Sequence, residues 1–301
     1  TETLDGESTS KVAERLSITQ SALSDSISDL EQQVGVALFH RRKARGVVLT
    51  GAGEAILSHA RELLRQSEIF EFETARISQR AHGELRLGCY NLLVHSLMPM
   101  VYQAVDRHLP TLGIDLWEDH LANLQSRIRD SRLEAAFVYG VGFPEDFEYW
   151  PMGEIEPFIV LAADHPLAQM ERVDLNALAD EPFLMMDVSP SALNTESIFA
   201  EIGLKPKVDI RTRNLELIRS LVAARRGYSL LMLSAHQRTT SIEGKPIAVL
   251  PLANKVTVQS YGLMYLKQHR DTGKIALFRD MLGLHVVDAL REQQQAFIDA
   301  F

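Results

Sequence analysis

The sequence predicts an α + α/β chain, with an N-terminal winged helix-turn-helix, a long helix and a two-lobed α/β region. Three observations predict this fold class. Apolar residues recur at helical spacing on either side of a short break at residues 17–19. A helical pattern without proline then runs over residues 51–79. After Gly83, short apolar strands alternate with helices, which is typical of βαβ units and a mostly parallel sheet.

The first part of the chain has the pattern of two helices with a tight connection. Val12, Ala13 and Leu16 have the spacing of a buried helix face. Ser17 to Thr19 breaks this pattern, and Thr19 is suited to cap the next helix. The buried face of that next helix is predicted to consist of Ala22, Leu23, Ile27 and Leu30.

A basic segment follows these two helices. No Asp or Glu occurs between Gln32 and Gly53, and four cations crowd together there, namely Arg41, Arg42, Lys43 and Arg45. With Gly46 and the apolar run 47–49, this segment predicts a β-hairpin wing. The net charge of -9 argues weakly against a nucleic-acid partner. Bulk charge describes solubility, however, whereas a local basic patch can form a site.

The long helix, expected over residues 51–80, carries a heptad-like seam. The seam consists of Ile56, Ala60, Leu63, Ser67, Phe70, Thr74 and Ile77. The helix could pair two subunits or pack on its own domain. Pairing is favoured, because nothing nearby in the sequence forms a small core for the helix to cover.

The α/β region is longer than a single hydrophobic core usually accommodates, so we expect it to form two lobes. We expect a helix-turn-helix unit at 1–50, the helix at 51–80, a first lobe at 84–161 and 264–283, a second lobe at 162–263, and a C-terminal helix at 284–301. The role of that last helix stays open.

Several functional classes lack their signals in this sequence. Cys89 is the only cysteine, which excludes an internal disulfide and a multi-thiolate metal site, and it is expected to be a buried strand residue. The histidines show no metal-ligand spacing, and His165 before Pro166 is expected to be structural. We expect no metal, cofactor, signal peptide or membrane span. We expect a cytoplasmic location.

Two sets of residues together match a known family. The N-terminal set is Ala13, Leu16, Gln20, Ala22, Leu23, Ser24, Ile27, Leu30, Glu31, Gly35, Leu38, Phe39, Arg41, Leu49, Thr50, Gly53 and Glu54. The second set is residues 83–88, Pro99, residues 132–136, residues 164–167 and residues 221–223. On these residues the chain resembles the LysR-type transcriptional regulators. The resemblance covers nearly the whole chain, and it implies that further residues of the first helix precede Thr1.

This resemblance implies a ligand-responsive regulator that is not an enzyme. Residues 1–50 would bind double-stranded DNA at a pseudo-palindromic operator, and the long helix would pair subunits into a homodimer. The resemblance further implies a homotetramer that bends its DNA and affects RNA polymerase. The α/β region would resemble periplasmic binding proteins, with a small effector of unknown identity between its lobes.

The DNA contacts implied by the resemblance fall on the second helix and the wing. They are Thr19, Gln20, Ser21, Ser24, Asp25, Ser28, Arg41, Arg42, Lys43 and Arg45. Gln20 can bond adenine in bidentate fashion, and the wing cations can contact phosphates. The sequence departs from the family at Asp25, Ser28 and Asp29, since carboxylates repel phosphates. Asp25 could instead accept a hydrogen bond from cytosine.

The effector contacts are expected where strands end and helices begin. They are Tyr90, Asn91, Leu92, Leu93, His120, Tyr139, Gly140, Val188, Ser189, Ser191, Arg213, Asn214, Ser234 and His236. Leu92 stands where the family often has a hydroxyl. Asn91 and Arg213 are the groups most able to orient an anionic or carbonyl ligand. Each residue could equally serve a turn, a cap or lobe packing.

Two other classes of function remain as alternatives. A solute-binding module would use the same two lobes without any DNA function. An enzyme would need paired acid and base groups in the cleft, and none is evident in the sequence.

Overall fold

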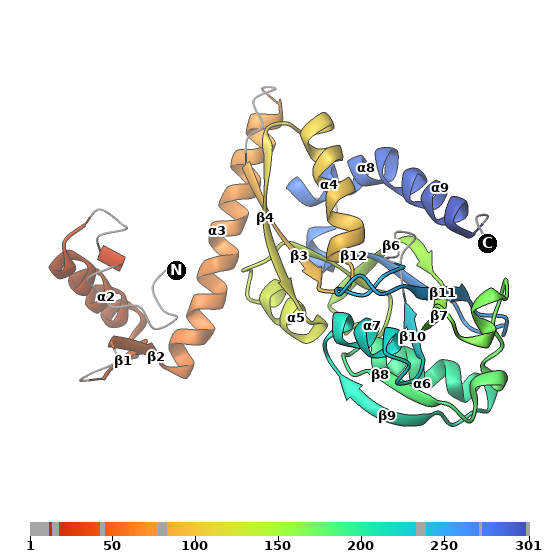
Figure 1. The fold of residues 1–301 in the computed structure, drawn as a ribbon. Coiled ribbons are helices and arrows are strands. Elements are labelled where there is room, and N and C mark those ends of the chain that lie inside the picture. The colour runs from red at the N-terminus through yellow and green to blue at the C-terminus, as the bar shows by residue number, and fades with distance from the viewer. Residues whose placement is uncertain are drawn as a thin grey trace.

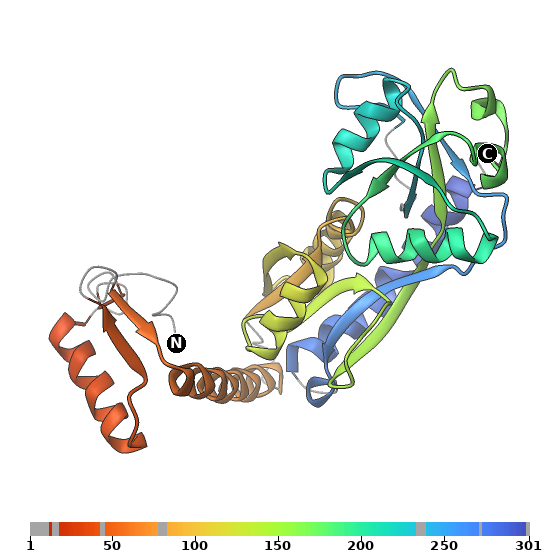
Figure 2. The same cartoon turned by 90° about the horizontal axis from the view of Figure 1, so that it is seen from below.

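The computed structural model describes residues 12–13, 18–42, 46–77, 83–232, 239–270 and 273–298. Figure 1 shows a small N-terminal unit at one end, joined by a long helix to a larger α/β part. Figure 2 shows the same separation from below. The predicted winged helix-turn-helix, long helix and two-lobed α/β region are therefore all present.

Helix α2 spans Gln20–Val34 and is capped at both ends. The Thr19 side chain accepts a hydrogen bond from the Ala22 N–H at 3.1 Å. Gly35 ends the helix in the left-handed region, at φ 79°. Leu23 is buried with Val12 and Ala13. These contacts fix α2 against the preceding helical residues, as predicted.

Two residues expected on the buried face of α2 are exposed instead. Ala22 lies beside the stripe formed by Leu23 and Ile27, about 100° around the helix from Leu23. Leu30 is on the stripe but one turn beyond the reach of residues 12–13, and 42% of its surface is exposed. The spacing of the apolar residues predicted which side of α2 is buried, but not how far along the helix the buried side extends.

The wing is a two-stranded hairpin, as the sequence predicts. Strand β1, Phe39–Arg42, pairs antiparallel with β2, Gly46–Leu49. Glu31 of α2 fixes the base of the wing. One of its carboxylate oxygens accepts hydrogen bonds from the N–H groups of Leu38 and Phe39, at 2.7 and 3.0 Å. The wing and α2 therefore form one unit.

Helix α3, Gly51–Ile77, starts directly after the wing. The Thr50 hydroxyl accepts the Gly53 N–H at 3.0 Å and donates to the Ala37 carbonyl at 2.8 Å. A side chain at Gly53 would come within 2.1 Å of the Leu38 carbonyl oxygen, so only glycine permits this close approach. The helix is thereby held rigidly at the base of the wing.

Lobe I is built on a five-stranded sheet with the order β4-β3-β5-β12-β6. Its strands are β3 Gly83–Tyr90, β4 Leu112–Asp119, β5 Ala135–Tyr139, β6 Phe147–Ile155 and β12 Gln259–Leu266. Its helices are α4 Val94–His108, α5 Leu121–Arg129, α8 Gly273–His285 and α9 Val287–Ile298, with the 3-10 turn η3 Lys267–His269.

Lobe II combines a three-stranded sheet, β10-β7-β11, with the parallel pair β8-β9. The bridge between Phe183 and Tyr228 joins the two sheets. Its strands are β7 Pro157–Ala162, β8 Pro182–Met186, β9 Lys207–Thr212, β10 Ser229–Met232 and β11 Ile247–Pro251. Its helices are α6 Ser191–Ile202 and α7 Leu215–Ala223, with the 3-10 turns η1 Pro166–Gln169 and η2 Leu175–Leu178.

The expectation of mostly parallel sheets was wrong. Strand β12 runs antiparallel to both β5 and β6, and β7 runs antiparallel to both β10 and β11. The reason is that the chain passes from lobe I into lobe II once and later returns to lobe I. Strand β6 leads directly into β7, and β11 leads back into β12.

These two crossings also shift the lobe limits. The chain passes between sheets at residue 156 and within residues 252–258, not at 161/162 and 263/264 as expected. The pairing of strands into sheets sets the limits of the lobes, and the composition of the sequence does not show which strands pair. Strand β6 was not predicted, because its sequence FEYWPMGEI contains Pro151 and no apolar run.

Candidate functional site

The solvent-facing side of α2 carries a row of small polar side chains. Gln20, Ser21, Asp25 and Ser28 are exposed and Ser24 is half-buried, as predicted for a surface that contacts a partner. The Ser28 hydroxyl donates to the Ser24 carbonyl at 2.9 Å, which leaves its oxygen free to accept. A helix with this face outward and Leu23 inward can enter a groove of matching width.

The wing cations can be located only in part. Arg41 and Arg42 lie in β1, but the description does not extend to their side chains. Lys43 and Arg45 lie outside the described residues. Their predicted phosphate contacts therefore stay predictions.

Helix α3 presents an exposed apolar side. Leu63 and Phe70 are each 72% exposed, while Ile56 and Ala60 are half-buried. Ser67 is exposed, and nothing is described of the Thr74 and Ile77 side chains. The predicted seam therefore carries two large apolar side chains, those of Leu63 and Phe70, that are mostly exposed.

Another side of α3 rests on lobe I. Glu62 accepts a hydrogen bond from the Ser131 hydroxyl at 3.2 Å, and its other oxygen lies 3.7 Å from Nε2 of the buried His269. The helix thus contacts its own effector region through a polar patch, and leaves Leu63 and Phe70 exposed.

The topology places the predicted effector segments on facing edges of the two lobes. Strands β3, β4 and β5 end at Tyr90, Asp119 and Tyr139 in lobe I, directly before the predicted residues Asn91, Leu92, Leu93, His120 and Gly140. In lobe II, β8 and β9 end before Val188, Ser189, Ser191, Arg213 and Asn214. Ser234 and His236 lie outside the described part of the chain.

A hydrogen bond joins the two lobes at this place. The Tyr90 hydroxyl lies 3.3 Å from the Ser191 hydroxyl, at the first turn of α6. The Tyr90 and Tyr139 rings meet edge to face, with centroids 5.3 Å apart. The side chains of Leu93, Tyr139, Val188 and Ser191 are all buried. Sequence segments about one hundred residues apart therefore form one closed inter-lobe contact.

The remaining predicted residues differ in what they do. The Asn214 side chain accepts the Leu217 N–H at 3.1 Å, so it caps α7, which is one of the alternatives left open. Asn91 and Arg213 are exposed, and Leu92 and His120 are half-buried. The Nδ1 atom of His120 is buried without a hydrogen-bond partner in the described structure.

One buried polar residue of α6 was not singled out from the sequence. Asn194 lies three positions after Ser191 on the same face of α6, and only 3% of its surface is exposed. The sequence signal for it was its spacing of three positions from Ser191.

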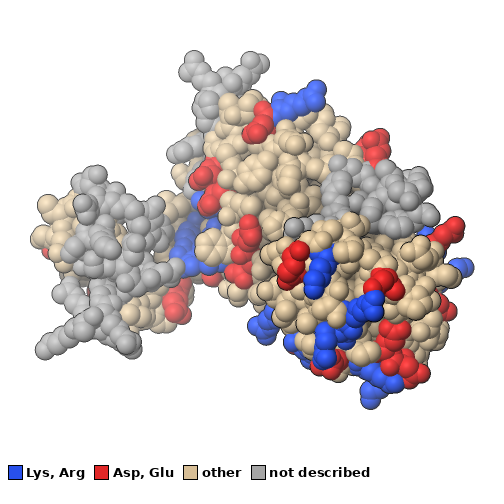
Figure 3. All heavy atoms as spheres, in the orientation of Figure 1, with Lys and Arg blue, Asp and Glu red and all other residues tan. Residues whose placement is uncertain are grey.

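Burial controls the ionisation of the groups in this contact. Burial raises the pKa of the Tyr90 and Tyr139 hydroxyls above their usual range. Both therefore stay protonated and neutral. Arg211 of β9 in lobe II lies 3.8 Å from Asp187 and 3.9 Å from Glu196. Figure 3 shows positive and negative groups interspersed over lobe II.

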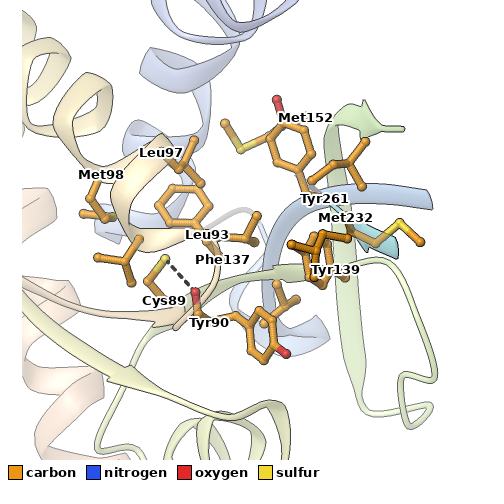
Figure 4. Close-up of a cluster of buried hydrophobic side chains, with 14 of the residues drawn as sticks. Cys89, Tyr90, Leu93, Leu97, Met98, Phe137, Tyr139, Met152, Met232 and Tyr261 are labelled. Atoms are coloured by element: carbon orange, nitrogen blue, oxygen red, sulfur yellow. Dashed lines mark hydrogen bonds between the residues drawn. The ribbon is translucent and has the colours of Figure 1, made fainter. Parts of the chain in front are cut away.

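Cys89 is fully buried in β3, as predicted. Burial raises the pKa of its thiol far above the usual range, and Sγ lies 3.7 Å from the Tyr90 carbonyl oxygen. Figure 4 shows it within the same buried cluster as Tyr90, Leu93 and Phe137. The thiol is thus protonated and inaccessible, which makes it a poor nucleophile.

A pocket of about 180 Å³ lies at the opposite edge of lobe II. Arg225 forms an ion pair with Asp164, and Nε2 of His165 lies 3.1 Å from a carboxylate oxygen of Glu181. His165 also accepts the Leu167 N–H at 3.1 Å and so caps η1, as its structural prediction implied. The polar groups that line this pocket therefore contact one another.

The described residues contain no cluster of three or more His, Cys, Asp or Glu that could hold a metal ion. Among the same residues, no helix is long and apolar enough to cross a membrane.

Comparison with known proteins gives two family matches. Residues 2–54 match the bacterial regulatory helix-turn-helix protein, lysR family, and residues 78–286 match the LysR substrate binding domain. A hydrogen peroxide-inducible genes activator of Pectobacterium carotovorum subsp. carotovorum is 25% identical over 96% of this chain and 92% of its own length.

Two further proteins are similar over most of their length. The uncharacterized HTH-type transcriptional regulator YnfL of Escherichia coli (strain K12) is 28% identical over 93% of each chain. The crystal structure of HinK, a LysR family transcriptional regulator from Pseudomonas aeruginosa, matches with a TM-score of 0.64 and 26% identity. That match covers 95% of this chain and 93% of HinK.

Proposed function

Because this chain belongs to the LysR family of ligand-responsive transcriptional regulators, we propose that it binds a pseudo-palindromic operator as a homodimer. The observation that carries the proposal is the two-sided character of α2. Leu23 packs inward on Val12 and Ala13, while the polar row beginning at Gln20 faces solvent. A recognition helix needs this arrangement to enter the major groove.

The polar row and the wing would divide the recognition between them. Gln20 can donate to and accept from adenine, and the serines at 21, 24 and 28 can do either with a base edge. Asp25 would accept a hydrogen bond from the N4 amino group of cytosine. The cations Arg41, Arg42, Lys43 and Arg45 would contact phosphates and offset the repulsion from Asp25 and Asp29.

Helix α3 would provide the two-fold contact. Its exposed Leu63 and Phe70 support this, since pairing would cover them. A two-fold dimer predicts half-sites one helical turn apart, about 34–36 Å, or a multiple of that spacing. A tetramer that bends its DNA and changes the access of RNA polymerase, in the cytoplasm, completes the proposal.

The effector would bind between the lobes, where the Tyr90–Ser191 contact joins them. A ligand that prefers one arrangement of the lobes shifts the population toward it, and only by that difference in affinity. Lobe I contacts α3 through Glu62 and Ser131, so a change in the lobes can reach the DNA-binding unit.

The relative from Pectobacterium is named for hydrogen peroxide, but this chain offers no thiol switch. Cys89 is the only cysteine among its 301 residues and is fully buried. A disulfide within the chain needs two cysteines, and oxidation favours exposed thiolates. We therefore propose that the effector binds without a covalent step.

Replacing Cys89 with alanine is expected to leave the response of a reporter gene to peroxide unchanged, because the buried thiol does not react. The same variant should lose some stability, because a small cavity forms in the buried strand. Reporter assays with and without peroxide measure the first effect. Loss of a peroxide response in the variant would contradict this proposal.

Selection of bound sequences from a random duplex library, with the full chain, tests the DNA function. The expected result is a pseudo-palindromic consensus with two half-sites. No enrichment even at low salt would contradict it and favour the solute-binding alternative. The salt must be stated, because phosphate contacts make the affinity strongly salt-dependent.

A further inference from the structure

Two helices of the α/β region end in a backbone turn that usually holds glycine. At the end of α6 this turn is made by Gly203, at φ 75°. After α5 and α7 the same position holds Ser131 at φ 54° and Arg225 at φ 60°, the two residues other than glycine with a positive φ in the described part of the chain. A side chain is unfavourable in this left-handed region, so its presence there indicates a role for the side chain.

The turn after α5 has the full hydrogen-bond pattern of a Schellman motif. The N–H of Ser131 donates to the Ile128 carbonyl at 3.1 Å, and the N–H of Arg132 donates to the Arg127 carbonyl at 2.8 Å. The turn after α7 has the same two bonds, at 2.9 and 3.0 Å. Glycine would form either turn without the steric cost of a side chain. The backbone geometry alone therefore does not account for Ser131.

The side chains at these two positions make different contacts. Arg225 forms an exposed ion pair with Asp164 inside lobe II. Ser131 is 8% exposed, and its hydroxyl donates to a carboxylate oxygen of Glu62 on α3 at 3.2 Å. The other oxygen of Glu62 lies 3.7 Å from Nε2 of His269, which is 2% exposed. Ser131 thus connects lobe I to the helix that leads to the DNA-binding unit.

Helix α5 joins this contact to the edge of lobe I where the effector is proposed to bind. The helix begins directly after His120, whose N–H donates to the Asp119 carboxylate at 2.8 Å, and Ser131 at its other end contacts α3 (Figure 1). It packs closely on β3, because a side chain at Gly88 would come within 2.8 Å of Leu124. Close-packed elements transmit displacements, so a shift at one end of α5 reaches the other.

We propose that Ser131 is a positioning residue of this regulator. Its hydroxyl holds Glu62, fixes α3 to the end of α5, and so couples the effector edge of lobe I to the DNA-binding unit. This role accounts for a serine at a position that suits glycine. The coupling to DNA rests on the proposed function, whereas the contact between α5 and α3 does not.

The first test compares two substitutions at equivalent turns of the full chain, without DNA. Ser131→Gly removes the hydroxyl that holds Glu62, and Arg225→Gly is the matched control at the end of α7. Neither is expected to lower the melting temperature by more than a few degrees, because glycine suits both turns. Ser131→Gly alone should raise the hydrogen-exchange rate of α3 amides around residue 62 about tenfold. Unchanged exchange in Ser131→Gly, or an equal rise in Arg225→Gly, would overturn the proposal.

The variant Glu62→Ala tests the same contact from α3. Alanine favours the helix, so α3 is expected to form in this variant. Its α3 amides should also exchange faster, and adding Ser131→Gly should cause no further rise, because both substitutions remove the same hydrogen bond. Two rises that multiply in the double variant would show that Ser131 acts elsewhere, and would overturn the proposal.

The second test measures whether DNA binding reaches the end of α5, as reciprocal coupling requires. The probe is the most enriched duplex from the library selection. In the unchanged chain and in Arg225→Gly, this duplex should slow hydrogen exchange at residues 126–134. The slowing should be lost in Ser131→Gly. Slowing that persists in Ser131→Gly, or that is absent from the unchanged chain, would overturn the proposal.

The two tests separate failure of this inference from failure of the proposed function, because the first needs no DNA. Enriched operator sequences together with unchanged α3 exchange in Ser131→Gly would overturn the role of Ser131 and leave the regulator intact. Absence of enriched sequences would contradict the DNA function, whatever the exchange rates of α3.

Discussion

Replacing Lys274 with methionine is expected to lower the free energy of unfolding by about 3–5 kcal/mol. Lys274 of α8 is 5% exposed, and its ammonium donates to the Glu84 carbonyl at 2.6 Å and to the Glu134 carboxylate at 3.2 Å. Glu134 is itself 3% exposed. Methionine would leave that carboxylate buried without its cation, and this uncompensated charge is the cause of the loss.

Urea unfolding of the full chain measures this change. Lys207→Met is the matched control, because Lys207 makes the same type of ion pair with Asp180 at the exposed surface. The control is expected to change stability far less. The double variant Lys274→Met with Glu134→Leu should recover part of the loss, since it removes both charges. Equal effects of Lys274→Met and Lys207→Met would contradict the account.

Replacing Leu63 with glutamate is expected to separate the proposed dimer into subunits. Leu63 is 72% exposed in the single chain, and a two-fold interface would bury two copies of it. Each buried leucine contributes about 1.5–3 kcal/mol. Losing both, and adding two like charges, should raise the dimer dissociation constant at least about a hundredfold. Operator affinity should fall with it, because one subunit reads only one half-site.

Sedimentation of the full chain measures the oligomeric state, and operator binding measures the consequence. Leu284→Glu is the control, because Leu284 is 74% exposed near the end of α8 and lies outside the seam. The control should keep the dimer and the operator affinity. A Leu63→Glu variant that sediments like the unchanged protein would rule out this side of α3 as the subunit contact.

Much of the fold could be predicted because local signals agree with it. The cap at Thr19, the alternating apolar stripe of α2 and the proline-free run of α3 each specify their own element. The antiparallel strand β6 could not be predicted, because its pairing with β12 depends on residues more than one hundred positions away. The prediction that Leu30 is buried was wrong for the same reason. The spacing of apolar residues shows which face of a helix they share, but not whether another element covers that face.

The candidate site could be predicted down to its segments but not to its contacts. Strand ends and helix starts pointed to Tyr139, Val188 and Ser191, and each of these is buried in the structure. The sequence could not show that Asn214 caps a helix or that Asn194 is buried. Both depend on where a helix begins, and helix starts are the least certain part of a pattern.

The central claim is that an effector between the lobes changes DNA binding at the far end of α3. The most direct measurement is the operator affinity of the full chain with and without a small molecule shown by calorimetry to bind it. The account predicts a change of about five- to 150-fold, and an equal change in the affinity for that molecule when operator is added, because linkage is reciprocal. A molecule that binds with no change in operator affinity or footprint would contradict it.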